Sequence, residues 1–297
     1  MSDRLMPVAI CYDFDGTLAP GNMQEHAFLP KLGITPNEFW TKSNDLAREQ
    51  QGDRILTYMH LMLKEADHAN ISMRKEDWAE YGKGIHLFPG TEGWFPRISE
   101  EGRQRGLDIE HYIISSGMRE MIAGTPVQRY LKAVFASGFL YNASGVAIAP
   151  AMAVNYTTKT QYLFRINKGV LDLSVDAAVN AYVAPDDRRV PFSNMIFIGD
   201  GDTDIPCFRL VKEQGGHSIA VFPAGDAAKA ERVGRLIQER RVHCAAPADY
   251  NAGSDLDRRV LAVFDLIAAR ATITAPHPDV PVVPAKQGGL QPAITRP

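Results

Sequence analysis

Residues 7–18 read PVAICYDFDGTL, and the stretch changes abruptly in character at Asp13. The residues before it form an uncharged, mostly apolar run, and those after it bring a second carboxylate, Asp15, and then Gly16. A β-prone run that closes on acidic residues and glycine is typical of a buried strand with a polar C-terminal end. The stretch therefore predicts a strand that delivers two carboxylates to one edge of a sheet.

Other stretches further along the chain end in the same way. Residues 111–114 (HYII) run into 115–117 (SSG), and residues 195–198 (MIFI) run into 199–204 (GDGDTD). A fourth apolar run follows at 219–222, and helical patterns separate the runs. Strands that alternate with helices predict an α/β protein with a Rossmann-like parallel sheet and helices on both faces. The carboxyl ends of parallel strands share one edge, where open α/β sheets bind their ligands.

The segment between the first two of these strands has a helical pattern throughout. Thr35 and Glu38 form a capping box with Pro36 at the first helical position. A third helix is expected over residues 72–81. A second helix is expected between the one that starts at the capping box and the one over residues 72–81. It carries one apolar stripe at helical spacing, which is most simply explained by helix–helix packing. The stripe consists of Ile55, Tyr58, Met59, Met62, Leu63 and Ala66.

These patterns divide the chain into a core, an insertion and a tail. The core is expected to comprise residues 1–18 and 87–271, and an all-helical insertion to comprise residues 19–86. Within the core, residues 146–156 predict small strands interrupted by a proline, and a last amphipathic helix opens at 254–257. Residues 272–297 hold six of the nineteen prolines and no helical period, which predicts an extended or disordered tail.

Composition excludes several classes of protein. The chain has 297 residues, 32 Lys plus Arg against 35 Asp plus Glu, and a formal net charge of −3, so nothing global favours nucleic acid as a partner. Three cysteines with no C-x-x-C spacing argue against a disulfide framework and suit a reducing compartment. The sequence shows no membrane-spanning run and no secretory signal at its start. A cytoplasmic protein that does not contact a membrane is the expectation.

The aspartates that follow the first and third strands point to a metal ion. Five carboxylates at one sheet edge repel one another unless a cation neutralises them or water screens them. All-oxygen ligation favours a hard ion, and Mg²⁺ is the usual ion where phosphate is handled. A calcium loop would need Gly at position 6 and Glu at position 12. Position 12 is Gln24 when counted from Asp13, and positions 6 and 12 are Ile205 and Val211 when counted from Asp200.

The three polar clusters together resemble the motifs of the haloacid dehalogenase superfamily. Residues 13–18 (DFDGTL) resemble its first motif, 113–117 (IISSG) its second, and 199–204 (GDGDTD) its fourth, in the right order. Residues 115–122 (SSGMREMI) and 130–140 (YLKAVFASGFL) resemble the phosphoserine phosphatase branch. The resemblance implies a Rossmann-like core with a helical cap of the C1 type, inserted at residues 19–86.

The resemblance also implies roles for the acidic residues. Asp13 would be the nucleophile that forms an aspartyl-phosphate, and Asp15 would protonate the leaving group and then activate water. Mg²⁺ would be held by the Asp13 carboxylate, the backbone carbonyl of Asp15 and the Asp200 carboxylate. Asp204 would orient a metal-bound water or a lysine.

Phosphate oxygens would be bound by Ser115 and by the amides of Ser116 and Gly117, near a helix N-terminus. A lysine is needed to offset charge in the transition state. Lys159 and Lys168 both occur in the stretch TTKTQYLFRINKG. Lys159 is favoured because it follows a plausible strand end and helix cap, whereas Lys168 precedes a glycine typical of a helix end.

The resemblance implies a Mg²⁺-dependent phosphatase acting on a small phosphorylated metabolite. Dehalogenases of this superfamily lack the second carboxylate, so Asp15 favours phosphoryl transfer. Alternatives are a phosphotransferase or mutase with the same chemistry, and a regulatory domain that binds phosphate or Mg²⁺ without turnover. Glu25, Arg48 and Arg54 are candidates for contacts with an amino acid or another polar group, although ordinary surface charge is the simpler explanation for each of them.

Overall fold

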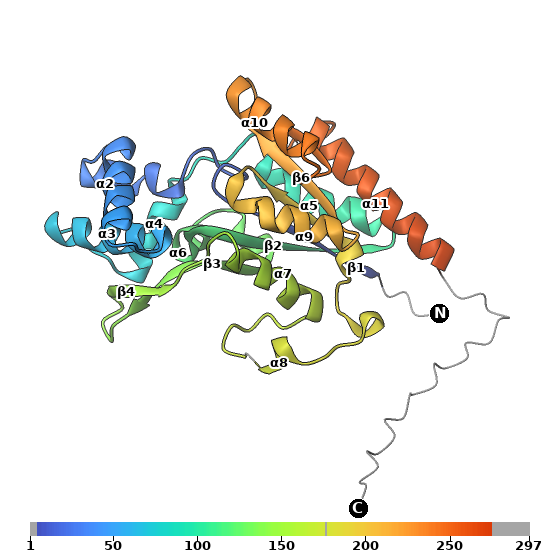
Figure 1. Ribbon diagram of the computed structural model, residues 1–297, viewed down its shortest axis with the longest axis horizontal. Helices are drawn as coiled ribbons and strands as arrows, with labels where there is room; N and C mark the ends of the chain where they lie inside the picture. Colours follow the sequence, from blue (N-terminus) through green and yellow to red (C-terminus); the bar gives the residue numbers. More distant parts are fainter. Residues whose placement is uncertain (1–4, 176, 275–297) are drawn as a thin grey trace, which may run out of the picture.

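The computed structural model describes residues 5–175 and 177–274 and has a seven-stranded sheet at its centre (Figure 1). The strand order is β4-β3-β2-β1-β5-β6-β7, and all neighbouring pairs are parallel except β3 and β4. The strands are β1 (Met6–Tyr12), β2 (Leu107–Met118), β3 (Leu131–Tyr141), β4 (Ala147–Met152), β5 (Met195–Gly199), β6 (His217–Phe222) and β7 (Cys244–Pro247).

Helices connect these strands and cover the sheet. Helices α1 to α4 lie between β1 and β2, and Figure 1 shows α2, α3 and α4 grouped at one end of the molecule, near β4. The helices are α1 (Phe28–Leu32), α2 (Pro36–Glu49), α3 (Arg54–His68), α4 (Lys75–Lys83), α5 (Thr91–Arg103), α6 (Arg119–Ala123), α7 (Thr158–Lys168), α8 (Ala177–Asn180), α9 (Ile205–Glu213), α10 (Ala227–Gln238) and α11 (Asp255–Thr274).

The central strand β1 is buried on both faces, as the apolar run predicted. Val8 and Ile10 pack into one hydrophobic cluster with α5 and α11, whereas Ala9 and Cys11 pack into a second cluster with α7, α9 and α10. Successive side chains of a strand point to opposite faces, so a strand covered on both sides needs apolar residues at every position. The α/β class with helices on both faces is therefore confirmed.

The structure corrects three details of the sequence analysis. The sheet is mixed rather than wholly parallel, because β3 and β4 form an antiparallel hairpin. The hairpin strand β4 runs continuously through Pro150, which is tolerated because β4 is an edge strand of the sheet. Helix α11 continues to Thr274, past the expected start of the tail at residue 272. The remainder of that expected tail, residues 275–297, lies outside the described residues.

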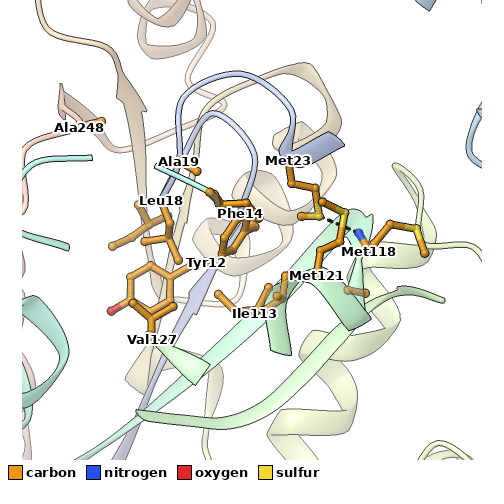
Figure 2. Packing of buried hydrophobic residues seen from close by; sticks show 14 of the residues in the cluster. Tyr12, Phe14, Leu18, Ala19, Met23, Ile113, Met118, Met121, Val127 and Ala248 are labelled. Atoms are coloured by element: carbon orange, nitrogen blue, oxygen red, sulfur yellow. Dashed lines mark hydrogen bonds between the residues drawn. The ribbon is translucent and has the colours of Figure 1, made fainter. Parts of the chain in front are cut away.

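The start of the helical region packs directly on the loop that follows β1. Figure 2 shows the Met23 side chain beside Phe14, with its sulfur 3.0 Å from the amide nitrogen of Met118 at the end of β2. The Asp15 carboxylate accepts a hydrogen bond from the Met23 amide at 2.9 Å. The acidic loop, the end of β2 and the first turn of the helical region are thus packed as one unit.

His111 provides a stability prediction that is independent of the acidic loop. Its ring is 3% exposed and lies between the Tyr12 hydroxyl, 3.0 Å from Nδ1, and the Ser99 hydroxyl, 3.1 Å from Nε2. Burial lowers the pKa of His111 to about 3. The unfolded chain binds a proton here below pH ~6.5, whereas the folded chain does not until pH ~3, so acid favours unfolding across that range.

We expect His111→Gln to reduce the acid sensitivity of the fold. Between pH 6.5 and 4.5 the free energy of unfolding of the wild type should fall by about 2–3 kcal/mol more than that of the variant. Urea unfolding at both pH values measures this difference. His60→Gln on the exposed face of α3 is the matched control. Equal losses in the wild type and His111→Gln would show that His111 is not a buried neutral group.

Candidate active site

The carboxyl ends of β1, β2 and β5 bring the polar motifs together at one edge of the sheet. The Asp13 amide donates to the Ile198 carbonyl at 2.9 Å, which fixes the loop after β1 beside the end of β5. Asp13, Ser115 and Asp200 all line one cavity of about 490 Å³. The three motifs, far apart in the sequence, therefore form one site because parallel strands end at the same edge.

A buried lysine lies at the base of this site. Lys159, in the first turn of α7, is fully buried, and its Nζ lies 2.8 Å from Asp13 Oδ2 and 2.8 Å from Asp204 Oδ1. Burial alone would lower the pKa of Lys159, but the two carboxylates outweigh it and hold that pKa above its usual range. Lys168, at the other end of α7, instead donates to the carbonyls of Val179 and Ala181. The structure thus places Lys159 in the acidic cluster and Lys168 outside it.

Three carboxyl groups of the cluster have raised pKa values. Burial, followed by the charge of Asp13, raises the pKa of Asp15 well above its usual range. The same two causes raise the pKa of Asp200 to about 6 and that of Asp204 to about 7. The single charge of Lys159 therefore does not neutralise the cluster, and a further cation would favour the ionised forms.

The donor set of the cluster fits a hard divalent ion. Carboxylate oxygens of Asp13, Asp200 and Asp204 lie within 4.8 Å of one another. Asp204 has other partners for both oxygens, because Oδ1 accepts from Lys159 and Oδ2 accepts from the Asp200 amide at 3.1 Å. Gly16 has φ +74°, and a Cβ there would lie 2.1 Å from Asp200 Oδ2, so the acidic loop passes directly against that carboxylate. Asp13 has partners too, because Oδ1 accepts from the Phe14 amide and Oδ2 pairs with Lys159. Asp200 is therefore the carboxylate of the three with the fewest competing partners.

The predicted phosphate-binding residues lie at the end of β2. Ser115 is fully buried and its Oγ accepts from the Gly117 amide at 3.0 Å, so that amide already has a partner. Both residues belong to the strand, and α6 begins at Arg119, two residues after Gly117, so a helix N-terminus lies near them, as expected. The Ser116 hydroxyl is buried with no hydrogen-bond partner among the described residues. Ser115, Ser116 and Gly117 all line the cavity.

Asp202 does not join the acidic cluster. Its side chain is 55% exposed and forms an ion pair with Arg232 of α10 at the rim of the cavity. The expectation of five converging carboxylates is therefore reduced to four. In the loop after β5, the buried Asp204 side chain accepts hydrogen bonds from the backbone amides of Asp200 and Gly201. The Asp202 side chain of the same loop is directed to solvent instead.

Residues of the helical region form part of the cavity wall. Trp40 of α2 and Arg54 and Tyr58 of α3 line the cavity, as does Asn155 from the loop between β4 and α7. Of the polar candidates from the sequence, Arg54 lines the cavity, whereas Arg48 pairs with Asp45 within α2.

Glu25, the third candidate, is engaged elsewhere. It accepts hydrogen bonds from Asn22 and from the Trp40 ring nitrogen. Trp40 and Asn155 were not singled out from the sequence. The proximity of Asn155 to Lys159 along the chain is the one signal that could have indicated it.

Comparison with known proteins assigns the chain to a family. The model of the haloacid dehalogenase-like hydrolases matches residues 10–209, and the chain belongs to that family. A curated protein of Borreliella burgdorferi, described as uncharacterized, is 27% identical over 283 residues, covering 86% of this chain and 96% of its own. Among the described residues, no helix is both long and apolar enough to cross a membrane.

Solved structures share the fold at low sequence identity. A HAD-family hydrolase from Salmonella enterica serovar Typhi superposes with a TM-score of 0.53 at 16% identity, covering 88% of this chain and 73% of its own. A phosphoserine phosphatase in its apo form gives 0.52 at 16% identity, covering 86% and 98%. A probable phosphoserine phosphatase from Vibrio cholerae gives 0.52 at 12% identity, covering 91% and 69%. The chain is thus a hydrolase-family protein with the fold of these enzymes.

Proposed function

We propose that the protein is a Mg²⁺-dependent phosphatase that hydrolyses a small phosphomonoester through an aspartyl-phosphate. The observation that carries the proposal is the placement of Asp13. Its carboxylate lies at the base of a cavity, 2.8 Å from a buried lysine and within 4.8 Å of a second carboxylate able to hold a cation. A carboxylate fixed in this way is oriented for nucleophilic attack on a group held in the cavity.

The residues of the site supply a balanced reaction. Asp13 attacks phosphorus, the bond from phosphorus to the substrate oxygen breaks, and Asp15 gives its proton to that oxygen. Burial and the neighbouring charge of Asp13 raise the pKa of Asp15, which suits a proton donor. Asp15 then takes a proton from water as the water attacks the aspartyl-phosphate, which releases phosphate and restores Asp13.

Positive charge is needed where the phosphoryl group carries its negative charge. Lys159 supplies one charge, and Ser115 and Ser116 supply hydroxyl groups at the same edge of the sheet. When bound between Asp13, Asp200 and the backbone carbonyl of Asp15, Mg²⁺ would neutralise the acidic cluster and the phosphoryl oxygens. Asp204 would act through Lys159, whose ammonium group it holds at 2.8 Å.

The proposal assigns distinct roles to the parts of the chain. Residues 19–86 would be the cap that selects the leaving group, and residues 1–18 and 87–271 the core that performs the chemistry. A cavity of about 490 Å³ suits a small metabolite. Because phosphoserine phosphatases share the fold, phosphorylated amino acids are one substrate class to test. Three free cysteines suit the cytoplasm as the place of the reaction.

Phosphate release from an aryl phosphate tests the proposal. We expect turnover with Mg²⁺ and a loss of at least about 10²-fold in EDTA, restored by added Mg²⁺. No turnover of the wild type with Mg²⁺ would refute the phosphatase assignment and favour a regulatory domain that binds phosphate. Transfer of the phosphoryl group to an added alcohol in place of water would indicate a phosphotransferase. A panel of phosphorylated metabolites compared by kcat/KM then identifies the substrate.

A further inference from the structure

Two parts of the helical region are attached to the core in different ways. Next to α4, the Ala147 amide donates to the Met73 carbonyl at 2.9 Å, which joins the start of α4 to the β3–β4 hairpin by backbone hydrogen bonding. Helix α4 then packs on α6 through glycines, since a Cβ on Gly82 would lie 1.9 Å from the Met121 carbonyl oxygen. Such close backbone packing cannot slide or open without losing many contacts at once.

At the start of α3, a side-chain pair joins the helical region to the core at the rim of the cavity. The Asn155 side chain donates from Nδ2 to Asp53 Oδ2 at 2.7 Å, across 102 residues of sequence. Asp53 precedes α3, and Asn155 lies in the loop before α7. Arg54, Ile55 and Asn155 all line the cavity, so this hydrogen bond spans its edge.

Each partner of the pair is also tied to the element behind it. Asp53 Oδ1 accepts from the amides of Ile55 and Leu56 at 2.8 and 3.0 Å, so one carboxylate oxygen caps α3 while the other meets Asn155. The Asn155 carbonyl accepts from the Lys159 amide at 2.9 Å, in the first turn of α7. The pair therefore connects the end of a cap helix to the turn that carries the buried lysine.

We propose that Asp53 and Asn155 form a latch that holds α2 and α3 closed over the active site, and that these two residues position the site for the reaction. The inference rests on the proposed function for its kinetic consequence. Tyr58, one turn further along α3, donates to the Ser116 carbonyl at 2.7 Å and contacts the floor of the cavity. The latch acts at the rim, where substrate enters and product leaves.

An exchange of the two side chains separates this role from a general loss of structure. Asp53→Asn keeps an oxygen to cap α3, because Asn and Asp are comparable N-cap residues, but it replaces the charge-assisted bond from Asn155 with at most a weaker bond between two neutral amides. Asn155→Asp places two carboxylates against each other. In the double variant the donor and acceptor are exchanged and the net charge of the wild type returns. Asp67→Asn, on the exposed face of the same helix, is the matched control.

Two measurements test whether the latch exists, and one of them does not depend on enzymatic activity. Trp40 lines the cavity, whereas Trp78 and Trp94 are fully buried, so acrylamide quenching of tryptophan fluorescence reports mainly on opening at Trp40. We expect quenching to increase in both single variants and to return to the wild-type value in the double variant. With Mg²⁺ and an aryl phosphate, kcat/KM should fall about 3- to 30-fold in Asp53→Asn and further in Asn155→Asp. It should recover to within about threefold in the double variant.

The outcomes distinguish the latch from the proposed function. Quenching that is unchanged in the single variants, or a double variant as open as Asn155→Asp, would overturn the latch whatever the activity. A wild type that does not turn over would refute the phosphatase proposal, while the quenching measurements would still decide whether the latch exists. Rescue of both quenching and kcat/KM by the double variant, with Asp67→Asn unchanged, would establish it.

Discussion

Asp13→Asn is expected to lower the rate of phosphate release by about 10³-fold or more while the protein stays folded. Asparagine has nearly the same shape as aspartate, and its carbonyl oxygen can still accept from the Phe14 amide, which lies 2.7 Å from Asp13 Oδ1. The amide group, however, cannot attack phosphorus to form the acyl-phosphate bond. Steady-state phosphate release with Mg²⁺ measures the loss.

The fold should tolerate this change because Asp13 adds to the repulsion in the cluster. Its charge contributes to the raised pKa values of Asp200 and Asp204, so its removal relieves repulsion between buried carboxylates. Lys159 loses Asp13 as an ion-pair partner in this variant but keeps Asp204 at 2.8 Å, so its charge is not left unpaired. We expect the free energy of unfolding in EDTA to stay within about 1 kcal/mol of the wild type or to increase. Asp108→Asn, exposed on β2, is the control that leaves activity unchanged. A fully active Asp13→Asn would show that another residue is the nucleophile.

The strands that carry the site could be predicted because each combines burial with an abrupt polar end. For β1 and β5 the apolar run and the carboxylates adjoin in the sequence, and the parallel sheet then brings the ends together. The β3–β4 hairpin was harder to recognise. The sequence predicted small strands over residues 146–156, but the continuity of β4 through Pro150 and its antiparallel pairing with β3 were not evident, because a proline usually interrupts a strand.

The wall of the cavity could not be predicted for a different reason. Trp40, Tyr58 and Asn155 meet there only because α2 and α3 fold back over the β4–α7 loop. No periodicity within one segment encodes a contact between two segments. Arg54 and Arg48 were equivalent in the sequence, and the structure separates them because Arg54, the first residue of α3, lines the cavity, whereas Arg48 pairs with Asp45.

Removal of the buried lysine is expected to have the second large effect. In Lys159→Met the fully buried carboxylate of Asp204 and that of Asp13 lose the ammonium group that lies 2.8 Å from each. Breaking a buried ion pair from one side leaves an uncompensated charge and costs about 3–5 kcal/mol. Denaturant unfolding in EDTA should show this loss, and phosphate release should fall about 10²-fold or more because positive charge beside the phosphoryl group is lost.

A second substitution separates charge balance from catalysis. Lys159→Met combined with Asp204→Asn removes one of the stranded carboxylates, so much of the lost stability should return while activity stays low. Lys168→Met is the matched control, because the Lys168 side chain donates to the carbonyls of Val179 and Ala181 and does not reach the acidic cluster. We expect this variant to lose about 1 kcal/mol of the free energy of unfolding and to keep the wild-type rate of phosphate release. If the free energy of unfolding of Lys159→Met lay within about 1 kcal/mol of the wild-type value, the buried ion pairs of Lys159 would be contradicted. A larger loss of activity in Lys168→Met than in Lys159→Met would assign the phosphate-binding lysine to the far end of α7.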